Sequence, residues 1–550
     1  MKCKLLLLLL CFTMFVLKRV LNLNILYFPL LIAIVLLGCM LCLAYLIPHL
    51  KAFFPKSKDL SKKSSVLFLL IMVLTYFILF SFKSTGQFNS FHSRMLDLGN
   101  MDQAIWNSSK GRLLESTNLI YPFTNKSRLS GHLEPVYLLL ACIYRIKADP
   151  RILLVFQTAL ISVAIITVYL LALYITGNRL KALSIAAIFS LFPSLQFMTL
   201  FDFHGDVLSI PFLFFSYYFY LSKKKTWYYL FIIAALSCKE YVALSVAGYG
   251  ISLIFMHKDI KNGITTSLLG TGYFLAAIFL IIPFFNQGNE PILISLNYSH
   301  IGGNEGLGGI ISYASGSPVQ FLRSILTRNS LENLFYLLFP LFFIPLRFWG
   351  FLWGAFPVIF KDLMAGLDIY NHRLAPAIPF LFIAFIYSLN EDWHLKFTRR
   401  TIKKNCLITL AFISTLIAAY TYGPSPLGHR FWRERNRYFK NEHSKTCLSV
   451  IKQIPSDAAI SVSSHLAPHL THRRFCYVFP RPSTVRNGNF NNVQFICIDT
   501  SDIESLFEGD TSFETQTIPA VYSSGFSLVT KEKSVFLFRK NEDWHSRQAD

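Results

Sequence analysis

The stretch DLGNMDQ at residues 97–103, joined by GHLEP at residues 131–135, interrupts a chain built largely of long apolar runs. One apolar run, Val66–Phe82, precedes this stretch, and another, Pro135–Ile146, follows it. Polar residues between membrane segments form loops at a membrane face, where ligands can reach them. We therefore predict that residues 97–135 form the first large exterior loop of a mainly α-helical membrane protein, and that this loop carries the functional site.

Composition supports the membrane assignment. The 550 residues are 53% hydrophobic, 16% aromatic and only 15% charged, which is too apolar for a soluble globular protein and is typical of a polytopic membrane protein. The net charge of +22 would suggest nucleic-acid binding in a soluble protein. Here Lys and Arg gather in short links between apolar runs, as the positive-inside rule expects, so binding to DNA or RNA is excluded.

The cysteines predict neither a zinc site nor a redox site. All ten are scattered, and most lie inside apolar runs. Cys476 and Cys497 could form a disulfide if the tail lies in an oxidising compartment, or both could remain isolated buried thiols.

Apolar length and Lys/Arg position predict about 13 spans with one orientation. Leu5–Leu17 is expected to be an uncleaved anchor, because Lys18-Arg19 stands where a small-residue cleavage site belongs. Ile25–Ile47 is long enough to cross about 30 Å of hydrocarbon. The basic link Lys51–Lys63 is then cytoplasmic, so Val66–Phe82 runs outward.

Two ambiguous segments decide the remaining topology. Pro135–Ile146 is short for a span and is predicted to lie at the membrane surface, and Trp227–Met256 is predicted to be a hairpin of two helices. With these choices the basic links stay inside. The later spans are predicted at residues 150–175, 181–200, 207–222, 227–238, 241–256, 264–285, 331–346, 349–361, 374–389 and 402–421.

This topology brings the polar motifs to one membrane face, although only Lys and Arg in the links were used to derive it. The motifs predicted to be exterior are the loop that contains Asp97, Phe201–His204, Lys239–Glu240, the long loop Asn286–Ser330 and Tyr370–Arg373.

The tail has a different composition, with prolines, charges and short β-rich runs. Residues 459–463, 493–498, 526–529 and 534–538 are predicted strands, and Glu442–Gln453 is a predicted helix. We therefore predict three domains: N-terminal anchor helices at 1–65, a transmembrane domain at 66–421, and a small exterior α/β domain at 422–550.

Several short motifs together carry a resemblance. They are Asp97-Leu98-Gly99, Asp102-Gln103 with Trp106, His132-Leu133-Glu134-Pro135, Phe201-Asp202-Phe203-His204, Lys239-Glu240, and Ala467-Pro468-His469-Leu470 with Arg473-Arg474. Over about residues 70–500 the chain resembles an uncharacterised family of predicted bacterial membrane proteins. The resemblance implies a multi-pass protein of the bacterial inner (plasma) membrane with its C-terminal domain on the exterior, periplasmic side.

That family is in turn similar to the C-superfamily (GT-C) glycosyltransferases, in which an exterior acid, a His-Pro-type element and a second acid recur. Asp97, His132 with Pro135, and Asp202 match those places, although Leu133-Glu134 separates His132 from Pro135. The similarity implies a GT-C-like fold and transfer of a sugar from a polyprenyl-phosphate donor to an envelope acceptor.

Such a reaction needs a carboxylate for the acceptor hydroxyl, cations for the departing phosphate and an apolar groove for the lipid. The catalytic candidates are Asp97, Asp102, His132, Glu134, Asp202 and His204. The candidates for donor-phosphate binding are Lys239, Glu240, His372, Arg373 and Arg473. Asp97 and Asp202 could hold a divalent cation, although two carboxylates so far apart in sequence are weak evidence for a metal.

Each candidate also has a structural interpretation. Asp97 could be an N-cap, and Glu134 before Pro135 could cap a helix that begins with proline. Asp202 and Asp206 could mark a solvated helix end, and Lys239-Glu240 could be a structural ion pair. The tail histidines could be ordinary surface residues; these are His465, His469 and His472.

Two other functions remain open from the sequence. A transporter would also use ionisable residues in the membrane, but it would be expected to show internal repeats. A non-enzymatic envelope protein would use its tail to bind a partner, which leaves the loops that contain Asp97 and Asp202 unexplained.

Overall fold

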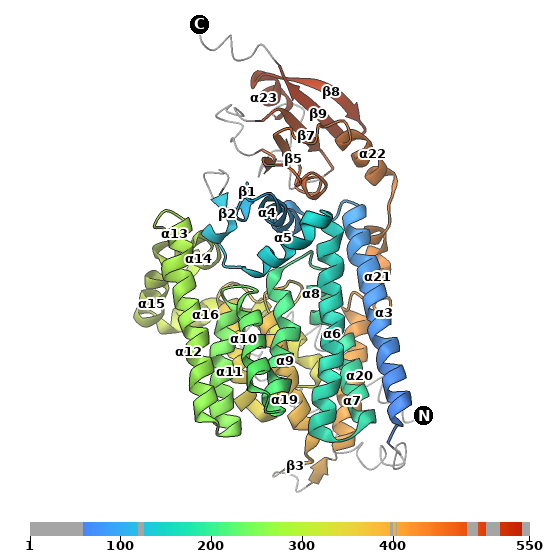
Figure 1. Cartoon of the computed structure of the whole chain (residues 1–550), viewed down its shortest axis with the longest axis vertical. Coiled ribbons are helices and arrows are strands. Elements are labelled where there is room, and N and C mark those ends of the chain that lie inside the picture. The colour runs from blue at the N-terminus through green and yellow to red at the C-terminus, as the bar shows by residue number, and fades with distance from the viewer. Residues whose placement is uncertain are drawn as a thin grey trace.

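The computed structural model describes residues 59–118, 126–395, 400–402, 404–480, 493–501 and 517–541. The predicted N-terminal runs Leu5–Leu17 and Ile25–Ile47 lie outside these residues. In the described part, long helices stand side by side, the C-terminal sheet caps one end of the bundle, and α4 and α5 lie between the two (Figure 1).

The bundle consists of α-helices and shorter 3-10 and π turns. Its elements are α3 (Lys62–Asn89), α6 (Pro150–Thr176), α7 (Arg179–Leu191), α8 (Pro193–Leu200), η4 (Gly205–Leu208), α9 (Ser209–Leu221), α10 (Lys225–Leu236), α11 (Val242–His257), α12 (Ile260–Ala276), η5 (Ala277–Ile281), α13 (Ile282–Phe285), α17 (Arg328–Leu338), η8 (Phe339–Leu341), η9 (Ile344–Gly354), α18 (Phe356–Met364), η10 (Ala375–Ala377), α19 (Ile378–Asn390) and α20 (Lys404–Thr421).

The outer helices expose apolar side chains, as expected of surfaces that face lipid. Only 22% of the most apolar window of α3 is buried, and the same holds for the segment Ile260–Phe285. The exposed apolar side chains of α3 are Val66, Leu67, Phe68, Leu70, Ile71, Leu74, Ile78 and Phe82. The protein is therefore a multi-pass membrane protein with several apolar helices.

Local sequence explains where the longest central helix begins and ends. The Asp149 side chain accepts a hydrogen bond from the Arg151 N–H, and Pro150 occupies the first turn of α6, where its missing N–H is not needed. Gly177 ends the helix in the left-handed conformation that glycine adopts readily.

The prediction of 13 spans is not confirmed. Among the described residues, four helices are long and apolar enough to cross a membrane, or up to six if two bent pairs each count as one span. The predicted spans at 331–346 and 349–361 are instead broken: the segments Arg328–Leu341 and Ile344–Gly354 meet at 113°. Pro340 and Pro345 lie at this bend, where proline removes backbone donors.

Other predicted elements agree with the structure. Trp227–Met256 forms two helices, α10 and α11, and Pro135–Ile146 contains the short helix α5 (Val136–Ile146). By contrast, the segment Asn286–Ser330, predicted as a long loop, is largely helical; it contains α14 (Ile292–Tyr298), η6 (Ser299–Ile301), η7 (Gly303–Glu305), α15 (Gly306–Gly316) and α16 (Pro318–Ile325).

The predicted active-site loop forms a small layer over the bundle. Its elements are η2 (Met95–Gly99), α4 (Asn100–Ser109), β1 (Glu115–Ser116), β2 (Lys126–Ser127), η3 (Arg128–Ser130) and then α5. A second hairpin, β3 (Trp393–Leu395) with β4 (Arg400–Ile402), lies at the opposite end of the bundle (Figure 1).

The C-terminal region is α/β, as predicted. Its elements are α21 (His429–Glu434), η11 (Arg435–Tyr438), α22 (Glu442–Ile451), β5 (Ile460–Val462), η12 (Ala467–His469), β6 (Cys476–Val478), β7 (Phe495–Asp499), α23 (Ile518–Ser523), β8 (Phe526–Glu532) and β9 (Val535–Lys540). The sheet order is β6-β5-β7-β9-β8, with β5 parallel to β6 and β7 and with β9 antiparallel to its neighbours. Strand β6 was not predicted. Cys476 and Cys497 are buried free thiols, so the disulfide alternative is wrong.

Candidate functional site

Asp97 lies in the π-helical turn η2 and faces His204. The Asp97 side chain is 32% exposed, and its Oδ1 lies 3.6 Å from His204 Nε2. Helix α4 has Gly99 at its N-cap with no side-chain cap, so the interpretation of Asp97 as an N-cap is wrong. His204 Nδ1 lies 3.1 Å from the Phe201 carbonyl oxygen, a contact that assigns the proton to Nδ1. The Nε2 atom that faces Asp97 is therefore a proton acceptor.

A second histidine, His372, stacks on His204 and pairs with a buried aspartate, Asp206. The rings of His204 and His372 stack with centroids 3.5 Å apart, and His372 Nδ1 lies 2.6 Å from Asp206 Oδ2. The Tyr241 hydroxyl donates to the same Asp206 oxygen. Burial opposes ionisation of Asp206, but His372 and Lys239 hold its pKa well below the usual range. The interpretation of Asp206 as part of a solvated helix end is therefore wrong.

The HLEP motif and Lys239-Glu240 form one buried network. His132 Nδ1 lies 2.8 Å from Glu240 Oε1, and the Leu133 N–H donates to Glu240 Oε2 at 3.1 Å. Glu134 accepts a hydrogen bond from Arg128 Nε, and its other oxygen lies 3.7 Å from Lys239 Nζ.

Glu134 is fully buried and makes no capping hydrogen bond, so the helix-cap interpretation is wrong for it. Burial alone would raise its pKa, but the adjacent Arg128 and Lys239 lower the pKa to about 2. Glu134 is therefore an anion at neutral pH and fixes two cations in place.

These residues border a large cavity of about 1110 Å³. One wall is apolar and is built from α11, α12, η5, the loop helices and α18; examples are Leu244, Ile251, Phe274, Ile278, Ile310 and Phe360. The polar end is lined by Arg128, His132, His204, Lys239, Glu240, Lys361, His372 and Arg373. Of the side chains that line the cavity, four are Lys or Arg and one is Asp or Glu, so its polar end presents mainly cations.

The cavity brings together motifs that are far apart in sequence. Each of the polar motifs that we predicted to share one membrane face contributes to its lining or stands beside a lining residue. Two lining cations, Lys361 and Arg373, pair with the buried Asp362, at 2.5 Å and 3.8 Å from its Oδ1. Sequence reasoning missed Lys361, although a charged residue inside an apolar run was the available signal.

Asp97 lines a second, smaller pocket of about 410 Å³ between the loop and the C-terminal region. Asp202 lines it as well and is held by the Ser93 hydroxyl at 2.6 Å and by the Arg94 N–H at 3.2 Å. Burial raises the pKa of Asp202 to about 6. Neither Asp97 nor Asp202 belongs to a group of three or more metal-ligand side chains among the described residues.

Asp102 and Arg473 lie away from both the cavity and the pocket. Asp102 is fully buried, accepts hydrogen bonds from the Tyr144 hydroxyl at 2.6 Å and from the Thr471 hydroxyl, and lies 3.0 Å from His472 Nε2. It therefore joins the loop to the C-terminal region. Arg473 donates to three backbone carbonyls of that region, those of Leu470, Pro455 and Ala458.

The tail histidines are not ordinary surface residues. His469 stacks between Phe88 and Phe91, with ring centroids 4.1 Å and 3.9 Å apart, and burial lowers its pKa to about 3. His472 approaches Asp102, and His465 is buried beside Asp499. The surface interpretation is therefore wrong for His465 and His469, whereas the His472 side chain is 31% exposed and pairs with Asp102.

Comparison with known proteins gives one family. The family described as "Predicted membrane protein (DUF2079)" matches residues 87–521, which include the loop, the cavity and most of the C-terminal region. No curated protein matches the chain.

Proposed function

The chain belongs to the DUF2079 family of predicted membrane proteins, and from this premise we propose that it is a transferase that uses a lipid-linked phosphate donor at the exterior membrane face. In this proposal it moves a sugar from a polyprenyl-phosphate-linked donor to an acceptor of the cell envelope, as a glycosyltransferase of the C-superfamily type.

The observation that carries the proposal is the amphiphilic cavity. A cationic end with Lys239, Lys361 and Arg373 matches a phosphate, and the long apolar wall matches a polyprenyl chain. The acid partners Glu134 and Asp362 do not line the cavity, so Lys239, Lys361 and Arg373 face a ligand there while these two carboxylates do not. A water-soluble sugar or ion would gain nothing from the apolar wall.

The distribution of charge supports an exterior orientation. Helix α6 begins close to α5 and runs 27 residues to a short link, after which Arg179 and Lys181 lie in the first turn of α7. Helix α9 begins beside the Asp206 site and ends before Lys223-Lys224-Lys225. Basic links at the end of the bundle opposite the cavity are expected on the cytoplasmic side.

The chemistry assigns a role to each side of the Asp97–His204 contact. The acceptor hydroxyl binds in the small pocket, and Asp97 accepts its proton while the neutral His204 assists. The acceptor oxygen forms the new bond to the sugar carbon, and the bond from that carbon to the phosphate oxygen breaks. The polyprenyl phosphate leaves with the bonding electrons, and Lys239 and Arg373 stabilise its negative charge.

The test is release of polyprenyl phosphate from polyprenyl-phosphate sugars, measured by mass spectrometry with the purified chain in liposomes and envelope extract as the acceptor. We expect the wild type to release it and Asp97→Asn to bind the donor without turnover. Asp457→Asn is the matched control, because Asp457 is exposed on the C-terminal region.

Equal release by the Asp97→Asn variant and the wild type would reject Asp97 as the base. Movement of the intact donor across the bilayer without release of polyprenyl phosphate would favour the transporter alternative instead.

A further inference from the structure

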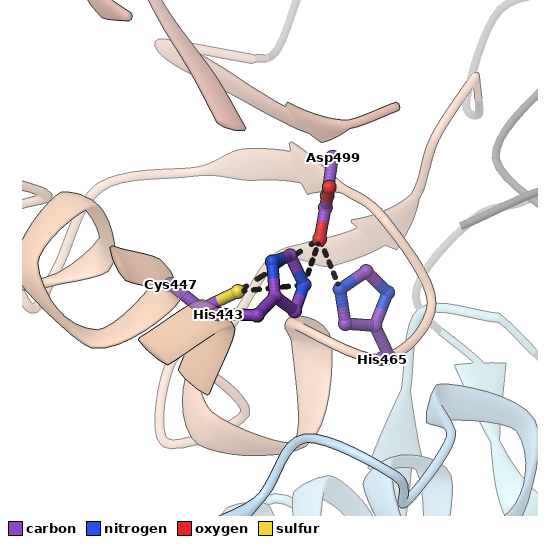
Figure 2. Close-up of side chains that lie close together, drawn as sticks. All are labelled: His443, Cys447, His465 and Asp499. Atoms are coloured by element: carbon purple, nitrogen blue, oxygen red, sulfur yellow. Dashed lines mark hydrogen bonds and ion pairs between the residues drawn. The ribbon is translucent and has the colours of Figure 1, made fainter. Parts of the chain in front are cut away.

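Four side chains that the proposed reaction does not use gather at the carboxyl ends of β5 and β7 in the C-terminal sheet: His443, Cys447, His465 and Asp499. Their nitrogen, sulfur and carboxylate ligand atoms all lie within 4.8 Å of one another, and Figure 2 shows the side chains directed at a common point. Cys447, His465 and Asp499 are buried, whereas the His443 side chain is 35% exposed. We call this group the His-Cys-His-Asp cluster.

The fold builds the cluster from three segments. A capping box at Asn441 begins α22, and His443 and Cys447 stand four residues apart on one face of that helix. Strands β5 and β7 are parallel neighbours, so their carboxyl ends meet at the same sheet edge. Asp499 is the last residue of β7, and His465 follows β5 in the next loop.

The distances are close to those of a tetrahedral metal site. Asp499 Oδ2 lies 2.8 Å from His443 Nε2 and 2.9 Å from His465 Nε2. Cys447 Sγ lies 3.4 Å from His443 Nε2 and 3.8 Å from Asp499 Oδ2. Zinc bonds of about 2.0–2.3 Å put neighbouring ligand atoms roughly 3.2–3.8 Å apart, so small outward movements would admit an ion.

The carboxylate is oriented by groups behind it. Asp499 Oδ1 accepts hydrogen bonds from the Ser501 hydroxyl at 2.8 Å and from the Ser501 N–H at 3.0 Å. The Asp499 N–H in turn donates to the Ser463 hydroxyl at 2.9 Å. These contacts hold Oδ1 and leave Oδ2 directed at the histidines and the thiol, which is how outer hydrogen bonds orient metal ligands.

We propose that His443, Cys447, His465 and Asp499 bind one Zn²⁺ as a closed, four-ligand structural site. The mixture of imidazole, thiolate and carboxylate ligands favours zinc over Mg²⁺ or Ca²⁺, which prefer oxygen ligands. A thiolate and a carboxylate balance the charge of the ion, and the thiol proton passes to water on binding. The site fastens α22 to the carboxyl ends of β5 and β7.

The cluster also borders the small pocket. His443, His465 and Ser501 line that pocket together with Asp97 and Asp202. A zinc ion at this place would therefore hold α22 and the loop after β5, which form this side of the pocket, in a fixed position relative to β7. The inference does not depend on the proposed sugar transfer, because its evidence lies entirely in the C-terminal region.

The test is the metal content of the full chain, purified in detergent after growth with Zn²⁺. Elemental mass spectrometry should find about one zinc per chain in the wild type. The His443→Ala and Cys447→Ala variants should lose stoichiometric zinc. The matched controls, His429→Ala at an exposed histidine and Cys476→Ala at a buried free thiol, should keep it.

Replacement of zinc by Co²⁺ gives a second readout, because a thiolate ligand produces a charge-transfer band that Cys447→Ala should abolish. His443 is partly exposed, so His443→Ala keeps the proposal testable if Cys447→Ala fails to fold; size-exclusion chromatography checks both. Absence of stoichiometric zinc from the wild type, or full zinc in either cluster variant, would overturn the proposal.

Discussion

The cavity and the small pocket hold two buried carboxylates that behave in opposite ways. Glu134 stands behind the cavity between Arg128 and Lys239, and its pKa falls to about 2. Asp202 lines the pocket, accepts hydrogen bonds from Ser93 and Arg94, and its pKa rises to about 6 because it is buried. Burial disfavours both anions, and only cations close to Glu134 reverse the effect. Glu134 is therefore held by charge pairs, whereas Asp202 is held by hydrogen bonds.

The largest expected effect is the fall in stability when Glu134 loses its charge. Glu134→Gln keeps the side-chain shape but leaves the buried Arg128 and Lys239 without their carboxylate. We expect the free energy of unfolding to fall by about 3–5 kcal/mol, the usual result of removing one partner of a buried ion pair. Unfolding of the purified chain in detergent, followed by tryptophan fluorescence, measures the change.

The control for this variant is Glu332→Gln. Glu332 pairs with Arg328 at 2.8 Å on a solvated helix face, where both side chains are at least a quarter exposed. Such pairs contribute about 0–1 kcal/mol. If the Glu134 and Glu332 variants lose the same stability, the buried charge pairs of Glu134 stabilise the protein no more than an exposed pair does, and the prediction for Glu134 is wrong.

The cavity was the more predictable of the two regions. Lys239-Glu240 interrupts an apolar run, and a charged pair there is conspicuous in sequence because its burial is costly. The positive-inside rule then brought that pair to the same end as Asp97 and His372 without any knowledge of packing. Asp206 was misjudged because its spacing from Asp202 also fits a solvated helix end, and burial cannot be read from spacing.

The His-Cys-His-Asp cluster was not predictable by the same reasoning. His443 and Cys447 lie in polar sequence, where a histidine four residues before a cysteine is unremarkable. Their approach to Asp499 depends on β5 lying beside β7, which is a property of sheet order rather than of local pattern. The prediction of straight spans near Pro340 failed for a related reason, since hydropathy does not report whether an apolar run forms one continuous helix.

The next effect is a pH dependence of stability at Asp202. Because the folded pKa of about 6 exceeds the usual value of 3.8, the folded protein favours the protonated carboxyl. The stability that the protonated Asp202 carboxyl contributes is complete below about pH 4 and is lost as the pH rises through 6. Relative to the wild type, Asp202→Asn should therefore gain roughly 2–3 kcal/mol of unfolding free energy between pH 4 and 7.

The readout for Asp202 is the change with pH, not the absolute difference between the two proteins. Asparagine alters the contacts with Ser93 and Arg94, which shifts the whole curve by a constant amount. Parallel curves for the variant and the wild type, measured by unfolding in detergent at several pH values, would show that Asp202 is not protonated on folding. The contrast with Glu134 would then fail.

The smallest expected effect is a change in lipid-phosphate affinity, which tests whether the cavity or the pocket binds the phosphate. Lys239→Met removes a cation that faces the cavity but keeps the apolar stem, and Glu134 retains Arg128 as its partner. We expect affinity for a polyprenyl phosphate to fall about tenfold, or about 1.4 kcal/mol, in a fluorescent-lipid competition assay. Arg437→Met is the matched variant because Arg437 lines the pocket, and it should leave that affinity unchanged. If Arg437→Met weakens lipid binding and Lys239→Met does not, the phosphate binds in the pocket, and the roles of donor and acceptor site are exchanged.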